Sequence, residues 1–177
     1  MAIEGQSGAA AGGQLEEKVD LTAETDSKLE QAETLAKSGQ LREALALLAA
    51  LEKKCRVGND NASLVRVCET SLVLCKEVAN DWEALMSTLQ TLSTRRSQKT
   101  AAVRALVQKA LPWCVQEPYT PLPVANETER ELRDKLVVAL REITDGKIFL
   151  ERERATLTRV LATIKVRRNA ELCRNSS

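Results

Sequence analysis

The chain has 177 residues, with 26 Lys and Arg against 25 Asp and Glu. This balance gives no overall field for nucleic acid or anionic lipid, so binding to either would need a local patch. The sequence contains no histidine, which excludes Ser–His and Cys–His catalysis in their usual form. Because glycine and proline are scarce and Ala, Leu, Glu and Arg abundant, the composition favours an all-α fold.

The N-terminal segment shows no apolar periodicity before Leu29 and is rich in Gly, Ala and charge. We therefore expect residues 1–20 to form a disordered tail. It lacks the basic and apolar regions of a secretion signal, and no apolar run approaches the ~20 residues of a membrane span. These features favour a cytoplasmic and nuclear protein that does not bind membranes.

Two helices are predicted next, over residues 23–38 and 41–57. Ser27 and Glu30 have capping-box spacing, and Gly39 is placed to end the first helix. The second helix carries an apolar stripe and ends before Gly58. The stripe comprises Leu41, Ala44, Leu45, Leu48 and Leu51. The short connection between the two helices predicts an antiparallel hairpin.

A second hairpin is predicted from Asn61 to about residue 93. Asn61 can cap its first helix, and Asn80 with Glu83 can cap its second. Its apolar positions repeat those of the first hairpin, because a shift of 41 residues places Leu41 on Trp82 and Leu48 on Leu89. Recurrence near 40 residues is typical of a tetratricopeptide-like or HEAT-like solenoid, and we expect antiparallel helix pairs stacked as a tetratricopeptide-like, right-handed solenoid over residues 21–166.

The third unit is less regular. A fifth helix begins near Ala102, and Pro112 is expected to kink or end it. The segment 117–125 contains three prolines and is expected to be a loop. Asn126 with Glu129 then caps a sixth helix that closes near Gly146, and a seventh is expected over 147–168. The repeat domain would thus hold about three helix pairs and one unpaired helix.

Nothing in the sequence carries an obvious chemistry. The five cysteines, Cys55, Cys68, Cys75, Cys114 and Cys173, form no CxxC pair, so we interpret them as small apolar side chains and not as zinc ligands. No phosphate-binding loop is present, and carboxylate pairs such as Glu129 and Asp134 resemble solvated helix faces. We expect no enzyme activity, catalytic residue, cofactor or metal.

One candidate partner-binding segment contains Arg95, Arg96 and Lys99, at the expected end of the fourth helix. These cations can complement the carbonyl groups that end a helix. They can also bind the acidic surface of a partner. Nucleic acid is a third alternative, although no aromatic side chain for base stacking accompanies them.

The second candidate segment contains Lys147, Glu151, Arg152, Glu153 and Arg154. Helical spacing predicts that Glu151 pairs with Arg154 and with Lys147. The segment is interpreted either as a solvated helix face or as a contact between subunits.

Two stretches carry a family resemblance: LSTRRSQ over 92–98 and TDGKIFLERERATLTRVLATIK over 144–165. Residues 21–165 resemble the 26S proteasome non-ATPase regulatory subunit 12 family. The resemblance implies a helical-repeat arm followed by a winged-helix module. It also implies a non-catalytic subunit that supports assembly of the proteasome lid, with other lid subunits and the neighbouring deubiquitinase as partners. Homo-oligomers are not expected.

The last residues depart from that family pattern after Lys165. We expect 167–177 to be a divergent, frayed tail and the winged-helix module to be absent. The chain would then be a fragment, an alternative transcript product or an early-terminated gene model. The seventh helix would then lack a covering neighbour and leave Leu150, Leu157, Leu161 and Ile164 partly in water. Two other functions remain open: a helical-repeat adaptor or scaffold of a signalosome or translation-initiation complex, and a nucleic-acid binder. The second would use Arg95, Arg96, Arg167 and Arg168.

Overall fold

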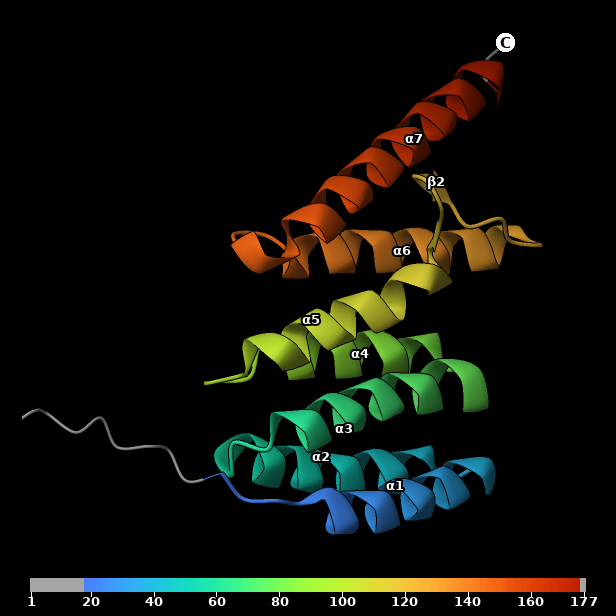
Figure 1. The fold of residues 1–177 in the computed structure, drawn as a ribbon. Helices are drawn as coiled ribbons and strands as arrows, with labels where there is room; N and C mark the ends of the chain where they lie inside the picture. The colour runs from blue at the N-terminus through green and yellow to red at the C-terminus, as the bar shows by residue number, and fades with distance from the viewer. Residues whose placement is uncertain (1–17, 176–177) are drawn as a thin grey trace, which may run out of the picture.

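The computed structural model describes residues 18–175 and confirms the all-α, helical-repeat fold in that part of the chain (Figure 1). Its α-helices are α1 (Thr22–Lys37), α2 (Leu41–Val57), α3 (Asn61–Val73), α4 (Trp82–Ser93), α5 (Thr100–Ala110), α6 (Glu127–Ile143) and α7 (Glu151–Asn175). A single apolar core connects all of them.

The start of the described chain is more fixed than expected. Residues 1–17, most of the expected tail, lie outside the described residues, but Val19 already contacts the first hairpin. The amide N–H of Val19 donates to the Gly58 carbonyl at 2.9 Å, and that of Leu21 to Asp60 Oδ2 at 2.9 Å. The end of the first hairpin therefore holds the chain before α1 begins.

The first two hairpins form as the sequence predicts. Helices α2 and α4 begin at Leu41 and Trp82, which preserves the shift of 41 residues. Gly39 has a φ of 85°, a left-handed conformation that suits glycine, and it closes the turn between α1 and α2. The α3 helix continues into a short π-helical turn, η1 (Leu74–Val78), before the chain reverses into α4.

The expected helix caps were wrong by one residue in this second hairpin. Asp60, not Asn61, caps α3, because its Oδ1 accepts from the Ser63 N–H at 3.2 Å. Asp81, not Asn80, caps α4 through the Ala84 N–H at 2.9 Å.

The physical reason at α4 is backbone conformation. Asn80 has a φ of 47°, in the left-handed region, and so belongs to the turn that ends the preceding helix. The capping box expected at the start of the first helix is also absent, because Ser27 lies inside α1, which begins at Thr22.

The third unit departs from a simple hairpin. After α5 the chain forms a 3₁₀ turn, η2 (Leu111–Trp113), where Pro112 ends the helix as expected. Two short antiparallel strands follow, β1 (Val115–Gln116) and β2 (Thr120–Pro121), with Val115 opposite Pro121. The segment expected to be only a loop therefore contains β2. The N-cap of α6 is confirmed, since Asn126 Oδ1 accepts from the Glu129 N–H at 2.8 Å.

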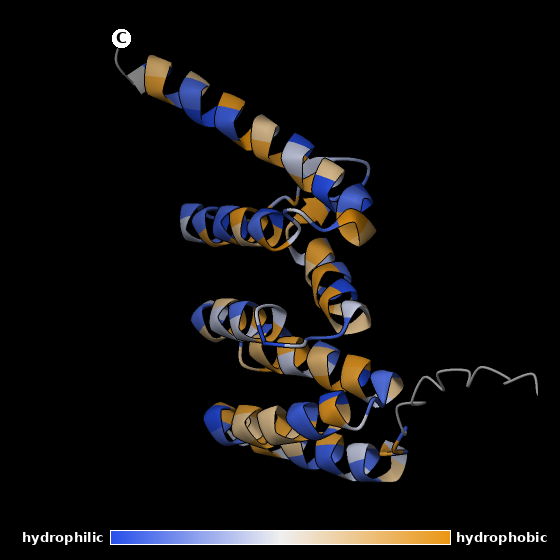
Figure 2. Cartoon of the chain, turned by 90° about the vertical axis from the view of Figure 1, so that its left-hand side faces the viewer, coloured by the Kyte–Doolittle hydropathy of each residue, from blue (hydrophilic) through white to orange (hydrophobic). Residues whose placement is uncertain are grey.

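The later helices pack against the earlier ones in a fixed order. Helix α5 packs mainly along α3, whereas α6 contacts α4 and α7. Helix α7 starts near the C-terminal end of α6 and rises diagonally away from the stack (Figures 1 and 2). Among the described helices, only the C-terminal end of α7 thus leaves the stack.

The apolar side chains of the seventh helix are more buried than expected. Leu150 and Leu157 are fully buried, Ile164 is 4% exposed and Leu161 is partly buried. Both α6 and β2 contact α7 and supply the cover that the sequence did not reveal. The helix also continues to Asn175, so the described part of the expected tail, residues 167–175, is helical.

Candidate protein-interaction surfaces

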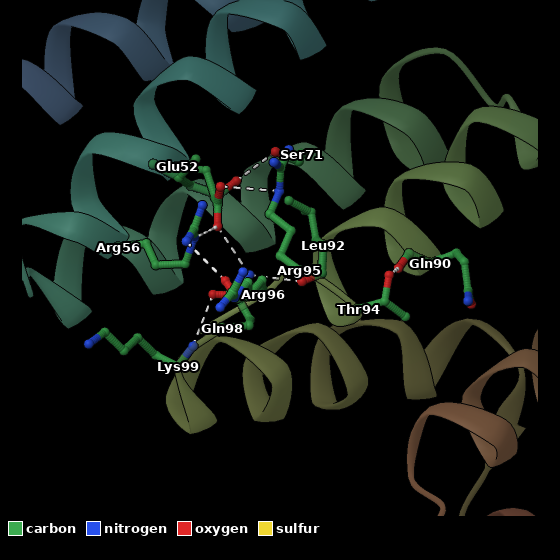
Figure 3. Close-up of polar contacts among 11 residues, drawn as sticks. Glu52, Arg56, Ser71, Gln90, Leu92, Thr94, Arg95, Arg96, Gln98 and Lys99 are labelled. Atoms are coloured by element: carbon green, nitrogen blue, oxygen red, sulfur yellow. Dashed lines mark hydrogen bonds and ion pairs between the residues drawn. The ribbon is translucent and has the colours of Figure 1, made fainter.

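The segment 95–99 lies beside a buried ionic cluster centred on Glu52 of α2 (Figure 3). The Glu52 side chain is fully buried in the stripe between Leu48 and Cys55. Its Oε1 accepts from Arg56 Nε at 3.0 Å and from Gln98 Nε2 at 3.1 Å. Its Oε2 forms an ion pair with Arg95 Nε at 3.2 Å, without the alignment of a hydrogen bond.

The same contacts fix the turn between α4 and α5. Arg56 donates to the Arg96 carbonyl at 3.1 Å, and Gln98 Nε2 donates to the Leu92 carbonyl at 2.8 Å, at the end of α4. Lys99 Nζ donates to Asn59 Oδ1 at 2.5 Å. Together these side chains connect the turn after α2 with the turn after α4, about one repeat further along the chain.

The three candidate cations therefore differ in availability. Arg95 neutralises Glu52, and Lys99 holds Asn59, so neither serves chiefly as a cation for the carbonyl groups at the end of α4. The side chain of Arg96 is exposed. Of this segment, Arg96 is the cation best placed to contact a partner.

Sequence reasoning missed Glu52, Arg56 and Gln98. A signal for Glu52 was present, because it lies four residues after Leu48 and three before Cys55, on the apolar face of α2. A carboxylate in such a stripe needs a cation, since an unpaired buried charge is costly.

The segment 147–154 begins with a second anchored turn. Lys147 Nζ donates to the Ile143 carbonyl at 2.5 Å, and residues Ile148–Leu150 form the 3₁₀ turn η3. Leu150 is fully buried, and the Arg104 guanidinium lies 5.7 Å from the ring centre of Phe149. The charged residues that follow are thus presented on a fixed helix start.

Neither of the two predicted ion pairs in this segment forms among the described residues. Glu153 Oε1 instead accepts from Gln108 Nε2 at 2.8 Å, and Arg154 lies 4.0 Å from Asp145. The side chains of Glu151, Arg152 and Arg154 are exposed, while Glu153 is partly buried. The structure therefore leaves three charged side chains at the start of α7 in solvent.

The described residues contain no cluster of three or more His, Cys, Asp or Glu that could hold a metal ion. Within the same part of the chain, no helix is long and apolar enough to cross a membrane. Burial raises the pKa of the Cys68 and Cys114 thiols to about 12, which opposes formation of a reactive thiolate.

Comparison with known proteins identifies the relatives of this chain. A family model described as "PSMD12/CSN4, N-terminal" matches residues 43–173, eight residues beyond the point where the family resemblance was expected to stop. The 26S proteasome non-ATPase regulatory subunit 12 of Dictyostelium discoideum is 36% identical over 146 residues, 82% of this chain and 30% of that protein.

Two further relatives are also subunits of the 26S proteasome. Homolog A of the same subunit in Arabidopsis thaliana is 34% identical, over 72% of this chain and 26% of its own length. The 26S proteasome regulatory subunit RPN5 of Saccharomyces cerevisiae is 30% identical, over 69% of this chain and 25% of its own length. The chain spans less than a third of each of these relatives. The family match, which covers most of the chain and all of α3 to α6, shows that the protein belongs to the PSMD12/CSN4 N-terminal family.

Proposed function

We propose that this chain is a non-catalytic structural arm of the 26S proteasome regulatory lid and supports lid assembly in ubiquitin-dependent protein degradation. The observation that carries the proposal is the 36% identity to a proteasome regulatory subunit over 82% of the chain. Its partners would be other lid subunits, including the neighbouring deubiquitinase, in the cytoplasm and nucleus. The helices would act by shape and adhesion.

Two surfaces are assigned to these contacts. The first is the start of α7, where Glu151, Arg152 and Arg154 are exposed on a helix held by the buried Leu150. The second is Arg96, whose turn is fixed by the Glu52 cluster. Rigid presentation supports this assignment, because a charged side chain on an ordered turn loses less entropy on binding.

Affinity purification of the tagged chain from cells, with identification of its partners, tests the proposal. We expect proteasome lid subunits to be recovered, and the double variant Arg152→Glu and Arg154→Glu to recover fewer. A matched control is the same charge reversal at Arg42 and Lys53, which are exposed on α2. Complete absence of lid subunits from the wild-type sample would overturn the proposed role, and equal losses for both variants would overturn the assigned surface.

A second candidate is a scaffold of a related complex, such as the signalosome or a translation-initiation complex. The shared family name favours this alternative, since it joins PSMD12 and CSN4. The same purification separates the two, because the recovered subunits identify the complex. Nucleic acid binding has less support, since Arg95 and Arg168 each contact a buried carboxylate.

A further inference from the structure

The second half of α7 forms an exposed surface that the proposed contacts do not use. The buried residues of this helix end at Ile164, and every side chain described from Lys165 to Arg174 is exposed. In Figures 1 and 2 this part of α7 rises away from α6. The divergence opens a groove of about 480 Å³ between the two helices. We call it the α6–α7 groove.

Opposite walls of the groove come from different segments. Pro123, Val124 and Arg130 lie on one wall, and Arg167, Ala170 and Arg174 lie on the other. Positions 167, 170 and 174 have helical spacing, so they share one face of α7. Arg167 and Arg174 are separated by two helical turns, about 10.5 Å along the axis. An alanine between two arginines leaves room for a side chain of a partner.

Several cations of the groove already have carboxylate partners. Arg133 donates from Nε and Nη2 to Asp134 Oδ1 at 2.9 and 2.6 Å, and Arg168 reaches Asp134 Oδ2 at 3.0 Å. Arg130 is shared between Glu127 at 2.8 Å and Glu171 at 3.5 Å.

Arg167 and Arg174 are different. Neither contacts a carboxylate among the described residues, although Arg174 Nε donates to the Ala170 carbonyl at 3.3 Å. These two guanidinium groups carry the uncompensated positive charge of the groove.

A second space between α6 and α7 adjoins the groove, and its lining has more acidic than basic residues. The second space between α6 and α7 is lined by Glu127, Glu131, Asp134 and Glu142 against Lys135, Lys165 and Arg168. Positive charge is therefore concentrated on the side that Arg167 and Arg174 occupy. This polarity gives the groove a directional preference for negative charge.

We propose that the α6–α7 groove binds an acidic segment of another protein, with two carboxylates about 10.5 Å apart that pair with Arg167 and Arg174 and apolar side chains between them. The apolar residues would contact Val124, Ala170 and the 69%-exposed Val166. A guanidinium pairs well with a carboxylate because its planar donors fit both oxygens. This inference goes beyond the proposed function, because it holds whichever complex contains the chain.

A protein segment fits the groove better than nucleic acid or a lipid surface. The carboxylates of Asp134 and Glu171 line the groove and already pair with Arg133, Arg168 and Arg130, so a continuous row of phosphates would find only Arg167 and Arg174 without a carboxylate partner among the described residues. No aromatic side chain lines it, so bases would find no stacking platform. The apolar wall favours a partner that alternates carboxylates with apolar side chains.

Fluorescence anisotropy with the whole chain tests the proposal. The probe is a labelled helical peptide with two glutamates placed two turns apart and leucines on the turn between them. We expect saturable binding that is at least roughly tenfold weaker for the double variant Arg167→Glu and Arg174→Glu. Replacement of both glutamates in the peptide by glutamine should produce a similar loss.

The matched control variant reverses Lys135 and Lys165, which line the second space between the same two helices. It has the same change in net charge and should alter the affinity by less than about twofold. Circular dichroism checks that both variants keep their helices.

Failure of the peptide to bind, or equal losses for the two variants, would overturn the proposal. Equally tight, equally Arg167-dependent binding of single-stranded RNA or of phosphatidylserine vesicles would also overturn it, in favour of a general polyanion site. Since the assay contains no proteasome subunit, its failure leaves the proposed function unaffected, and the purification from cells tests that function separately.

Discussion

The first two hairpins and the second half of α7 use most of their charges in opposite ways. In the hairpins, Glu52 and Arg95 face inward and connect one repeat to the next. In the second half of α7, charges of the same kind point into solvent around an open groove. The comparison indicates that internal ion pairs connect one repeat to the next beside the apolar core, whereas the second half of α7 exposes most of its charges to solvent.

The largest expected difference between these regions comes from placing the same carboxylate in each. Leu48→Asp inserts an unpaired charge at a fully buried position of α2 and should cost about 4 kcal/mol or more, enough to unfold the stack. Leu172→Asp places it on α7 at a position that is 66% exposed and should change stability by less than about 0.5 kcal/mol. Thermal unfolding followed by circular dichroism measures both. Wild-type melting of Leu48→Asp would contradict the assigned core.

The stability costs of removing single arginines compare the buried ion pairs of the two regions. Arg95→Ala leaves Glu52 Oε2 buried without its cation and should cost about 1.5–3 kcal/mol. Arg168→Ala removes the corresponding contact of Asp134, but the Arg168 side chain is 59% exposed and water can replace it, so the cost should stay below about 1 kcal/mol.

Arg96→Ala is the matched control for this experiment, because its exposed side chain lies next to Arg95 and should cost less than about 0.5 kcal/mol. Urea unfolding of the three variants measures the free energy of unfolding that each one loses. A cost for Arg168→Ala equal to that for Arg95→Ala would show that both regions depend on internal ion pairs.

The helices themselves could be predicted because their signals are local. Apolar spacing located α2 and α4, and Pro112 located the end of α5. The caps of α3 and α4 were displaced because each site offers two adjacent side-chain acceptors, as in Asp60 and Asn61. The choice between them depends on tertiary contacts, such as the N–H of Leu21 that occupies the second oxygen of Asp60.

The candidate sites were harder to predict because their partners are distant in sequence. Glu52 meets Gln98 across 46 residues, a separation that helical periodicity cannot reveal. The pair expected between Lys147 and Glu151 assumed one continuous helix. The 3₁₀ turn Ile148–Leu150 changes the rotation per residue, so the two side chains do not share a face.

Caps provide a smaller test within the stack. Asp60→Ala removes the acceptor for both Ser63 and Leu21 and should cost about 1–2 kcal/mol, because Asp60 caps α3 in a buried setting. Asp81→Ala removes only the exposed contact to Ala84 and should cost about 1 kcal/mol or less. Equal costs, measured by urea unfolding, would show that the contact to the N-terminal segment contributes nothing.

The contribution of Asp60 should also depend on pH. Burial alone would raise the pKa of the Asp60 carboxyl, but hydrogen bonds from Ser63 and Leu21 outweigh it and hold the pKa below the usual 3.8. A lowered pKa in the folded state stabilises the protein fully above the unfolded value, and this stability is lost as the pH falls through the folded value. The difference between wild type and Asp60→Asn should therefore shrink only below pH 3.8. A difference that is constant down to acid unfolding would contradict this assignment.

Thiol labelling perturbs the protein least and compares how readily cysteines in the helix stack and in α7 become accessible. Burial raises the pKa of the Cys55, Cys68, Cys75 and Cys114 thiols, whereas Cys173 of α7 is exposed. Iodoacetamide at pH 8 should modify Cys173 first, and the four buried thiols only when the fold opens, as read by mass spectrometry. Below the unfolding midpoint in urea, Cys114 should react before Cys68, because Cys114 lies in the turn after α5 whereas Cys68 lies in α3, which packs against α1, α2, α4 and α5. Identical rates for Cys114 and Cys68 would mean that the stack and the α6–α7 pair open as one cooperative unit, so that the contrast between them concerns the surface and not the stability of the fold.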